Sequence, residues 1–263
     1  MLKLDRVTKV FHPGTVDARR ALDNLSLHIL PGEFVSIIGA NGAGKSTLFN
    51  AICGSFYIDS GSVFLDDKDI TMMPEFRRAR QIGRLFQDPM RGTAPDMTIE
   101  ENLALTTWRG GWFTRITRQD RERFRERLSL LGMGLEDRMR QRVGLLSGGQ
   151  RQALTLLMAT FTIPKILLLD EHTAALDPGT AEKVLEITKK TVEDNHLTCL
   201  MITHNMQSAL ELGNRTLMMD SGRVIYDVSG AERDHLTVHD LTERFREEKG
   251  HALDNDRMLL GNI

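Results

Sequence analysis

The sequence contains the glycine-rich stretch Gly39-Ala40-Asn41-Gly42-Ala43-Gly44-Lys45-Ser46-Thr47. It follows an apolar run at residues 34–38 and precedes a helix-like segment that Gly54 closes. Strand, G-x-x-x-x-G-K-S and helix, in this order, form the P-loop arrangement. Its glycines let backbone N–H groups converge on phosphate oxygens, and the helix N-terminus adds the positive end of its dipole. We therefore expect a nucleotide here, with Lys45 reaching the β- and γ-phosphates and the Ser46 hydroxyl binding Mg²⁺.

The composition is that of an ordinary folded protein. The 263 residues, 41% hydrophobic and 27% charged, suffice for one large domain or two closely joined ones. A formal net charge of −2 gives no reason to expect a nucleic acid as partner. Cys53 and Cys199 form no disulfide framework, which fits a reducing cytosol. Because no uncharged apolar run reaches about 18 residues and residues 1–30 lack a signal-peptide core, we expect a cytoplasmic chain that does not itself cross the membrane.

Hydrophobic patterns predict strands in the first third of the chain. Residues 2–11 and 25–29 alternate between apolar and polar, which is typical of half-buried antiparallel strands. The continuous apolar run before the P-loop fits a strand buried on both faces. Two further strands are predicted at residues 62–65 and 82–87.

A helical insert is predicted at roughly residues 88–146. Thr98 and Glu101 are spaced as a capping box, which predicts a helix from there to about residue 107. Arg109-Gly110-Gly111 is expected to break this helix. A second helix is predicted at about residues 117–131, and six arginines lie between positions 115 and 127, interleaved with glutamates. Its arginine-rich surface is interpreted as a solvated, ion-paired helix face, with direct anion binding as the alternative.

The pentapeptide Leu146-Ser147-Gly148-Gly149-Gln150 predicts the start of a helix that runs to about residue 161. Ser147 and Gln150 have capping-box spacing. Glycine costs about 1 kcal/mol relative to alanine in a helix, so two glycines are a poor choice for stability alone. They make sense if the backbone must be approached closely, and such a helix N-terminus attracts phosphate.

Two acids follow the apolar run at residues 166–169, which predicts a buried parallel strand with Asp170 and Glu171 at its carboxyl end. Ligands of open α/β sheets lie at that edge. Asp170 could hold Mg²⁺, and Glu171 could orient the attacking water. The alternative, a pair of solvent-facing acids, carries little weight beside a P-loop.

The remaining segments complete an alternation of helices and strands. Asp177 and Pro178 predict the start of a helix that reaches about residue 194. A buried strand at 198–203 ends in His204, a hairpin turns at Ser221 and Gly222, and the tail is helical around residues 241–245.

The P-loop, the Leu-Ser-Gly-Gly-Gln pentapeptide and the Ile-Leu-Leu-Leu-Asp-Glu run at 166–171, in this order, resemble the ATP-binding subunit of ABC transporters over about residues 1–230. The resemblance implies an α/β fold: a P-loop NTPase core with a parallel sheet, an N-terminal antiparallel β subdomain and an inserted α-helical subdomain. It places the ATPase domain at residues 1–240 and a C-terminal helical extension at 241–263.

The resemblance also implies roles for single residues. Phe11 stands where an aromatic ring stacks on adenine, although tyrosine is more usual there; the alternative is an apolar strand residue. Gln87 matches the Q-loop glutamine, which touches Mg²⁺ and the attacking water. His204 matches the switch histidine at the γ-phosphate; the alternative is a surface histidine at a strand end. Asp177 matches the D-loop, and His172 stands where proline is common.

In that family two ATPase subunits pack head to tail, with each nucleotide between the P-loop of one and the Leu-Ser-Gly-Gly-Gln helix of the other. Ser147, Gly148, Gly149, Gln150 and Asp177 would then act on the partner's ATP. The helical insert would meet an integral membrane permease through a groove near the Q-loop, and an extracytoplasmic solute-binding protein would serve the same system. The chain would lie on the inner face of the cell membrane.

The expected function is therefore Mg²⁺-dependent ATP hydrolysis that powers a bacterial small-solute importer. One alternative is an ABC ATPase that drives a non-transport membrane complex; another is a DNA- or ribosome-associated protein, whose long coiled coils or tandem ATPase halves the sequence lacks. A non-hydrolysing member is disfavoured because Gln87, Glu171 and His204 are all present.

Overall fold

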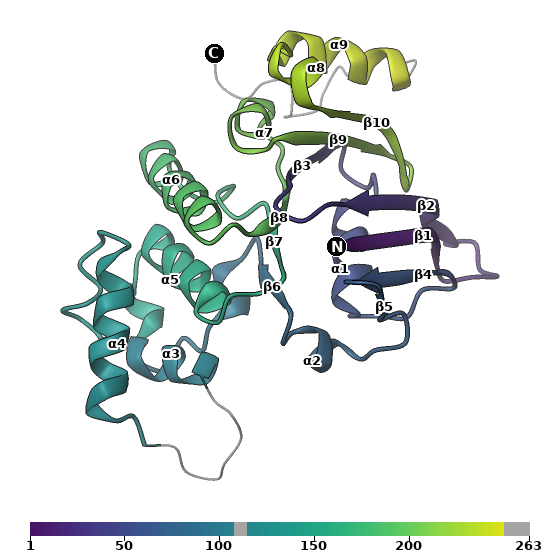
Figure 1. Ribbon diagram of the computed structural model, residues 1–263. Helices are drawn as coiled ribbons and strands as arrows, with labels where there is room; N and C mark the ends of the chain where they lie inside the picture. Colours follow the sequence, from purple (N-terminus) through teal and green to yellow (C-terminus); the bar gives the residue numbers. More distant parts are fainter. Residues whose placement is uncertain (108–114, 250–263) are drawn as a thin grey trace. The chain divides into compact units, whose positions relative to one another are not determined.

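The computed structural model describes residues 1–107 and 115–249 and divides into two units (Figure 1). One unit consists of Met1–Ile82 with Thr198–Ile263, and the other consists of Gly83–Leu197. Two predictions fall outside the described residues: the break of a helix at Arg109-Gly110-Gly111 and the part of the C-terminal extension beyond residue 249. Among the residues described, none of the helices combines the length and the apolar character that spanning a bilayer requires.

The first unit contains the predicted antiparallel sheet. Its strands are β1 (Leu2–Phe11), β2 (Arg19–Ile29), β4 (Ser60–Leu65) and β5 (Lys68–Asp69), in the order β2-β1-β4-β5 (Figure 1). All three neighbouring pairs are antiparallel. Strand β2 begins six residues before the predicted residue 25, because two exposed arginines followed by the buried pair Ala21-Leu22 hide the alternation.

The P-loop strand lies in a second sheet of the same unit. In this unit β3 (Phe34–Gly39) lies between β8 (Thr198–Ile202) and β9 (Arg215–Asp220), and β10 (Arg223–Ser229) follows β9. Strand β3 is parallel to both of its neighbours, whereas β9 and β10 form the predicted antiparallel hairpin. Every residue of β3 and β8 is buried, as expected of strands covered on both faces.

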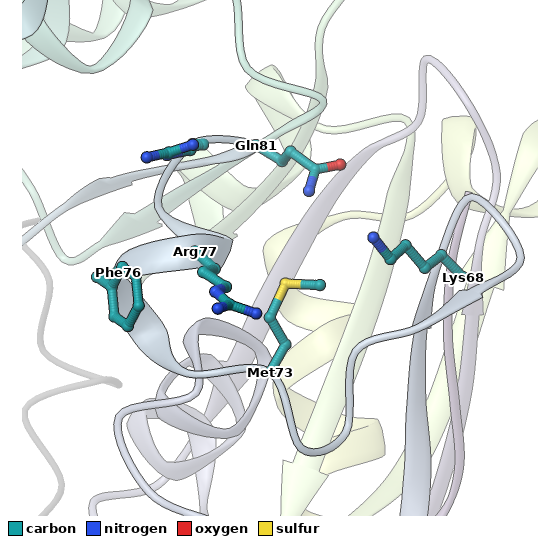
Figure 2. A pocket seen from close by; sticks show the side chains of 6 residues that line it. Lys68, Met73, Phe76, Arg77 and Gln81 are labelled. Atoms are coloured by element: carbon teal, nitrogen blue, oxygen red, sulfur yellow. The ribbon is translucent and has the colours of Figure 1, made fainter. Parts of the chain in front are cut away.

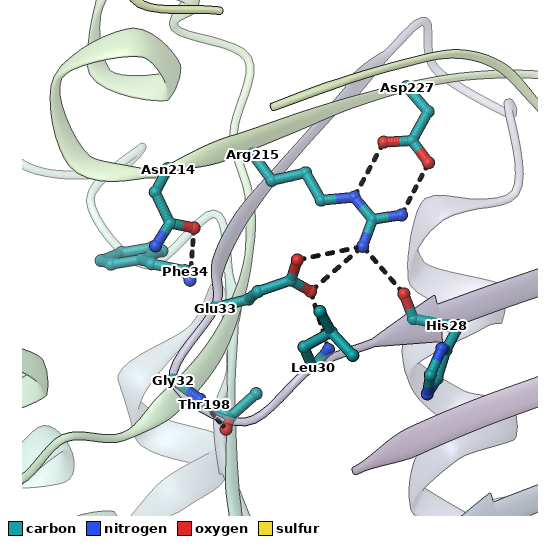
Figure 3. A network of polar contacts seen from close by, with 9 residues as sticks. All are labelled: His28, Leu30, Gly32, Glu33, Phe34, Thr198, Asn214, Arg215 and Asp227. Atoms are coloured by element: carbon teal, nitrogen blue, oxygen red, sulfur yellow. Dashed lines mark hydrogen bonds and ion pairs between the residues drawn. The ribbon is translucent and has the colours of Figure 1, made fainter. Parts of the chain in front are cut away.

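An ion-pair network fixes the beginning of β3 (Figure 3). The Arg215 guanidinium donates to both carboxylate oxygens of Asp227, at 2.8 and 2.6 Å, and its Nη1 lies 3.0 Å from Glu33 Oε2. The same Nη1 donates to the backbone oxygen of His28 at 2.8 Å. These hydrogen bonds raise the pKa of Arg215, Asp227 contributing most. The network therefore ties the end of β2, the residue before β3 and the β9–β10 hairpin to one another.

The described residues of the first unit also form the helices α1 (Lys45–Cys53), α2 (Glu75–Arg78), α7 (Met206–Leu212), α8 (Gly230–Asp234) and α9 (Val238–Lys249). The predicted helix after the P-loop is confirmed as α1. The helix predicted around residues 241–245 is confirmed as α9, whose Leu241 and Phe245 are fully buried in a cluster with Met206 and Met218. Helices α2, α7 and α8 are short and carry no periodic signal that predicts them.

Arg78 of α2 holds the carboxyl end of α1. Its side chain is only 2% exposed, and its Nη1 donates to the backbone oxygens of Ala51 and Ile52 at 2.8 and 2.9 Å. Burial lowers the pKa of this guanidinium. A cation at a helix C-terminus is favoured by the helix dipole, so Arg78 supports the helix that begins at the P-loop.

The second unit has a helical core beside two neighbouring strands, β6 (Ile82–Leu85) and β7 (Ile166–Asp170). Its α-helices are α3 (Ile99–Thr107), α4 (Arg118–Ser129), α5 (Gly148–Thr160) and α6 (Pro178–Asp194), with short 3₁₀ turns at Pro89–Gly92 and Val143–Leu145. The core contains residues of α3, α4 and α5 and of the segment between α4 and α5. This confirms the α/β fold with an inserted helical part.

The predicted capping and charge patterns of the insert are present. Glu101 accepts hydrogen bonds from the backbone N–H and the hydroxyl of Thr98, both at 2.7 Å. On α4, Arg118 pairs with the exposed Glu122 at 3.0 Å, while Arg121 reaches Glu100 of α3 at 2.8 Å. These pairs fit the solvated, ion-paired face rather than the alternative of anion binding.

Candidate nucleotide-binding and catalytic site

The P-loop connects the end of β3 to the start of α1. Gly44 precedes α1 with φ 102°, and no side chain caps the helix. A Cβ at Gly44 would lie 2.5 Å from the backbone oxygen of Ala21, so only glycine fits this turn. No side chain therefore caps the first N–H groups of α1, and their binding of an anion stays a prediction.

Lys45 places its ammonium group at the start of the loop. The side chain is 5% exposed, and Nζ donates to the backbone oxygens of Gly39 at 2.7 Å and Ala40 at 3.1 Å. A buried ammonium held by carbonyl groups beside an open helix N-terminus provides positive charge for a phosphate chain. Ser46 follows with an exposed side chain, and Thr47 is half-buried.

Two contacts that the sequence does not predict support the loop from other elements. The backbone N–H of Gly222, in the β9–β10 turn, donates to the oxygen of Ala43 at 2.9 Å. Arg19 Nη2, at the start of β2, donates to the oxygen of Gly42 at 2.8 Å. Neither contact can be predicted from a local motif, because each depends on how distant segments meet.

His204 follows the strand next to the P-loop strand. The parallel register places Ile37 of β3 opposite Ile202 of β8, so Gly39 and His204 each lie two residues beyond that pair. Both are therefore at the carboxyl edge of the sheet, where ligands of such sheets bind. His204 is half-buried, and the next residue, Asn205, caps α7. The first unit thus brings together two of the predicted site segments.

Phe11 ends β1 in a half-buried position. Its ring lies edge to face with Phe56, with centroids 5.4 Å apart, and Lys9 Nζ lies 5.7 Å from the Phe11 centroid. Across the sheet Phe11 is paired with Arg19. Phe11 is therefore an aromatic ring at a strand end, held by a second ring that the sequence does not single out.

The acidic pair lies at the carboxyl end of β7 in the second unit, with Asp170 as the last residue of the strand and Glu171 directly after it. All five residues of β7 are buried, including Asp170 at 9% exposure. Glu171 has φ 46°, in the left-handed region. For a residue other than glycine this conformation costs on the order of 1 kcal/mol, and proteins keep such strain mainly at functional sites.

An arginine that sequence analysis missed lies against Asp170. Arg84 Nη2 of β6 is 3.4 Å from Asp170 Oδ2, and both side chains are largely buried. The same guanidinium lies 4.6 Å from the ring centroid of Phe86, whose ring also receives Arg91 at 5.4 Å. Gln87 comes directly after this ring and is exposed. Arg84 therefore links the acidic strand end to the segment that carries Gln87.

The Leu-Ser-Gly-Gly-Gln helix begins as predicted. Ser147 Oγ accepts from the backbone N–H of Gln150 at 3.3 Å, and Gln150 Oε1 accepts from that of Ser147 at 3.2 Å, which completes the capping box. A Cβ at Gly149 would lie 2.0 Å from Thr180 Cγ2 of α6. Gly149 is thus required by packing between α5 and α6, and its contact with a ligand stays a prediction. Gly148 is exposed and remains the approachable one.

Asp177 lies beside the same helix start. It caps α6, accepting from the backbone N–H of Thr180 at 3.1 Å, and hydrogen bonds from Thr180 lower its pKa. Leu176 Cδ2 would be 3.1 Å from a Cβ on Gly148. All residues expected to act on the partner's nucleotide therefore lie together in the second unit.

His172 is a buried neutral side chain. It is 3% exposed, and its Nε2 lies 3.1 Å from Thr188 Oγ1, whose hydroxyl donates to the backbone oxygen of Val184 at 2.8 Å. Because the single hydroxyl hydrogen of Thr188 is used on Val184, Nε2 of His172 is the donor in their bond. Burial lowers the pKa of His172 from an ordinary 6.5 to about 4. His172 is therefore a structural residue directly after the turn that carries Glu171.

We expect His172 to make the protein less stable in acid. The unfolded chain binds a proton at His172 below pH 6.5, whereas the folded chain binds it only near pH 4. Stability is therefore lost as the pH falls through this window, by about 3 kcal/mol at most, and the loss levels off below it. Denaturant unfolding should show that His172→Gln loses less of its free energy of unfolding between neutral and acid pH than wild type does. The control His28→Gln, at an exposed position, should lose as much as wild type. An equal loss of the free energy of unfolding in all three proteins would contradict this prediction.

The comparisons with known proteins agree with this geometry. A family model described as ABC transporter matches residues 22–174. The chain is 42% identical over 247 residues to the tyrosine transport ATP-binding protein of Clostridioides difficile (strain R20291), covering 93% of this chain and 98% of that protein. It is 36% identical over 230 residues to the methionine import ATP-binding protein MetN of Escherichia coli (strain K12), covering 86% of this chain and 64% of MetN.

Solved structures show the same fold. A dimeric ATP-binding cassette in a post-hydrolysis state with ADP and Pi has a TM-score of 0.74 and 32% identity, covering 87% of this chain and 98% of its own. A nucleotide-free cassette from an ABC transporter has a TM-score of 0.74 and 28% identity, covering 89% and 92%. The chain belongs to the ABC transporter family. It is an ATPase of the cassette type, which the sequence predicts from its motifs.

Proposed function

We propose that this chain is the ATP-hydrolysing subunit of a bacterial importer for an amino acid or a similarly small solute, and that it drives a separate membrane permease. The observation that carries the proposal is the similarity, over nearly the full length of both chains, to a protein named for tyrosine transport. A match to a methionine import protein supports the same class of solute. An extracytoplasmic solute-binding protein and a position on the inner face of the membrane belong to this proposal.

The residues divide the chemistry of hydrolysis between them. Lys45 and the N-terminus of α1 bind the phosphates, and Glu171 orients the water that attacks the γ-phosphate and takes up its proton. Gln87 and His204 contact the attacking water and the γ-phosphate. Ser147 and Gly148 of a second copy close over the same γ-phosphate with the positive end of their helix.

The donors present fit Mg²⁺. Ser46 offers an exposed hydroxyl at the start of α1, and Asp170 and Gln87 offer a carboxylate and an amide oxygen. Within residues 1–107 and 115–249 no group of three or more acidic, histidine or cysteine side chains could bind a metal on its own. Mg²⁺ ordinarily combines one or two protein oxygens with water and substrate phosphates, so this sparse donor set suits it. The ion would neutralise charge on the phosphate oxygens.

The surface that we propose as the docking site for the permease is a groove of about 470 Å³, formed by residues that precede Gln87 in the sequence (Figure 2). Its lining residues are Lys68, Met73, Phe76, Arg77, Arg80 and Gln81. Three of them are cationic, and at the same surface Phe76 and the neighbouring Met72 are 66% and 71% exposed. An exposed apolar surface of this kind marks an interaction site, and its positive charge selects an acidic, amphipathic segment of the permease.

The test is recovery of the permease from membranes of the source cell with the tagged chain. We expect one multispanning membrane protein to copurify with wild type and with the control Arg6→Glu, whose side chain is exposed elsewhere in the same unit. Arg77→Glu with Arg80→Glu should lose it, because like charges then face each other. If wild type recovers no membrane protein, or one without transport activity when reconstituted, the importer proposal fails. If wild type recovers the permease and the charge-reversed variant recovers it equally well, the importer proposal stands and the groove is not the docking surface.

A further inference from the structure

Arg19 lies on the same face of the sheet as Phe11. The two residues are directly opposite each other in the antiparallel β1–β2 pair, so their Cβ atoms are about 4.5–5.5 Å apart. The preceding pair of β1, Val10 with Arg20, places Arg20 on the other face. Arg19 therefore starts beside the aromatic ring that we assign to adenine.

The same side chain ends on the P-loop. Arg19 Nη2 donates to the backbone oxygen of Gly42 at 2.8 Å, and a Cβ at Gly42 would lie only 2.4 Å from that nitrogen. The guanidinium therefore packs directly on the loop backbone, where any larger residue at position 42 would displace it. Arg19 spans the distance from the Phe11 side of the sheet to the phosphate-binding loop.

The guanidinium of Arg19 also has hydrogen-bonding capacity left. It offers about five N–H donors, of which the bond to Gly42 uses one, and within the described part of the chain no carboxylate pairs with it. Its neighbour Arg20 differs, because Asp23 neutralises it at 3.0 Å. Arg19 is thus an exposed cation with unused donors, held at the edge of the P-loop.

We propose that Arg19 binds the phosphate chain of the nucleotide, between the P-loop and the base. This rests on ATP binding at the P-loop with its base at Phe11. A nucleotide that spans these two points passes the Arg19 guanidinium, and its phosphate oxygens are stronger acceptors than the Gly42 carbonyl because the bond is charge-assisted. Arg19 is a binding residue that neither the motifs nor the family resemblance assigns.

The test is titration calorimetry of ATP and ADP against matched variants. Arg19→Ala should weaken binding of both nucleotides about tenfold at low salt, and Arg19→Lys should recover part of the loss. The loss should shrink at about 1 M salt, where the Debye length is about 3 Å. Arg20→Ala, the matched control, should bind as wild type does.

Phe11→Ala provides the contrast. It should weaken ATP binding about two- to tenfold through lost stacking, with a loss that salt does not reduce, and Phe11→Tyr should bind normally. Wild-type affinity in Arg19→Ala, or a loss as insensitive to salt as that of Phe11→Ala, would overturn the role of Arg19 while ATP binding itself stands. Absence of ATP binding by wild type in the same titrations would instead overturn the nucleotide site. Thermal melting of each apo variant close to that of wild type excludes a loss caused by unfolding.

Discussion

Glu171→Gln should reduce the rate of ATP hydrolysis by roughly 10²–10⁴ while ATP binding is retained. The replacement keeps the size and shape of the side chain, and it removes the negative charge that activates water. It also leaves the turn intact, because glutamine and glutamate meet the same cost at the left-handed φ of 46°. On the barrier the loss corresponds to about 3–5 kcal/mol. Steady-state phosphate release measures it, with the permease present.

The control for Glu171 is Glu182→Gln, an exposed glutamate on α6 in the same unit. It should hydrolyse ATP at the wild-type rate, which shows that removing one negative charge nearby is not enough. Titration calorimetry should give Glu171→Gln a near-normal ATP affinity. Because this variant hydrolyses ATP slowly, we also expect its ATP-bound dimer to live longer than that of wild type. A Glu171→Gln protein that turns over at the wild-type rate would show that another group activates the water.

Much of the fold could be predicted because its signals are local. The P-loop glycines, the capping boxes at Thr98 and Ser147 and the Asp177–Pro178 helix start each need only a few neighbouring residues. Helix α6 ends at Asp194, the residue that the pattern predicts. Buried strands such as β7 are visible as apolar runs because both faces are covered.

The remaining features depend on contacts between distant segments. Strand β2 starts with exposed polar residues, and its first half is recognisable only from its pairing with β1. Arg84 meets Asp170 through two neighbouring strands that are far apart in the sequence. The packing role of Gly149 becomes visible only when α6 is seen to occupy the space of its missing Cβ. Sequence shows the residue type in each case, and only the fold shows its neighbour.

The two glycines of the Leu-Ser-Gly-Gly-Gln helix should respond differently to substitution. Gly148 is exposed, and the nearest atom to an added Cβ is the flexible end of Leu176 at 3.1 Å. The helix dipole stabilises a carboxylate at this position. Gly148→Asp should therefore fold and bind ATP, since the P-loop is unchanged. Gly149→Asp should be destabilised, because Thr180 fills the site. In the proposed head-to-tail dimer, Gly148→Asp should abolish hydrolysis by placing a negative charge at the partner's γ-phosphate.

Mixing two inactive proteins should therefore restore activity. Lys45→Ala has a defective P-loop and an intact Gly148, and Gly148→Asp has the reverse. In a mixed dimer one site has both defects, whereas the other pairs an intact P-loop with an intact helix start. With random pairing half of the dimers are mixed, so an equal mixture should reach about a quarter of wild-type ATPase activity if the sites work independently.

The negative control for the mixture is Lys45→Ala combined with a protein that carries Lys45→Ala and Gly148→Asp in one chain. No dimer in that mixture has an intact P-loop, so it should remain inactive at every ratio. Both mixtures are measured with the proposed permease present, which we expect to hold the dimers together. If the complementary mixture stays inactive although each variant folds and dimerises, or if Gly148→Asp hydrolyses ATP normally as a dilute monomer, then Gly148 does not act on the nucleotide of the partner. The shared site would then have to be abandoned in favour of a nucleotide pocket completed within one chain.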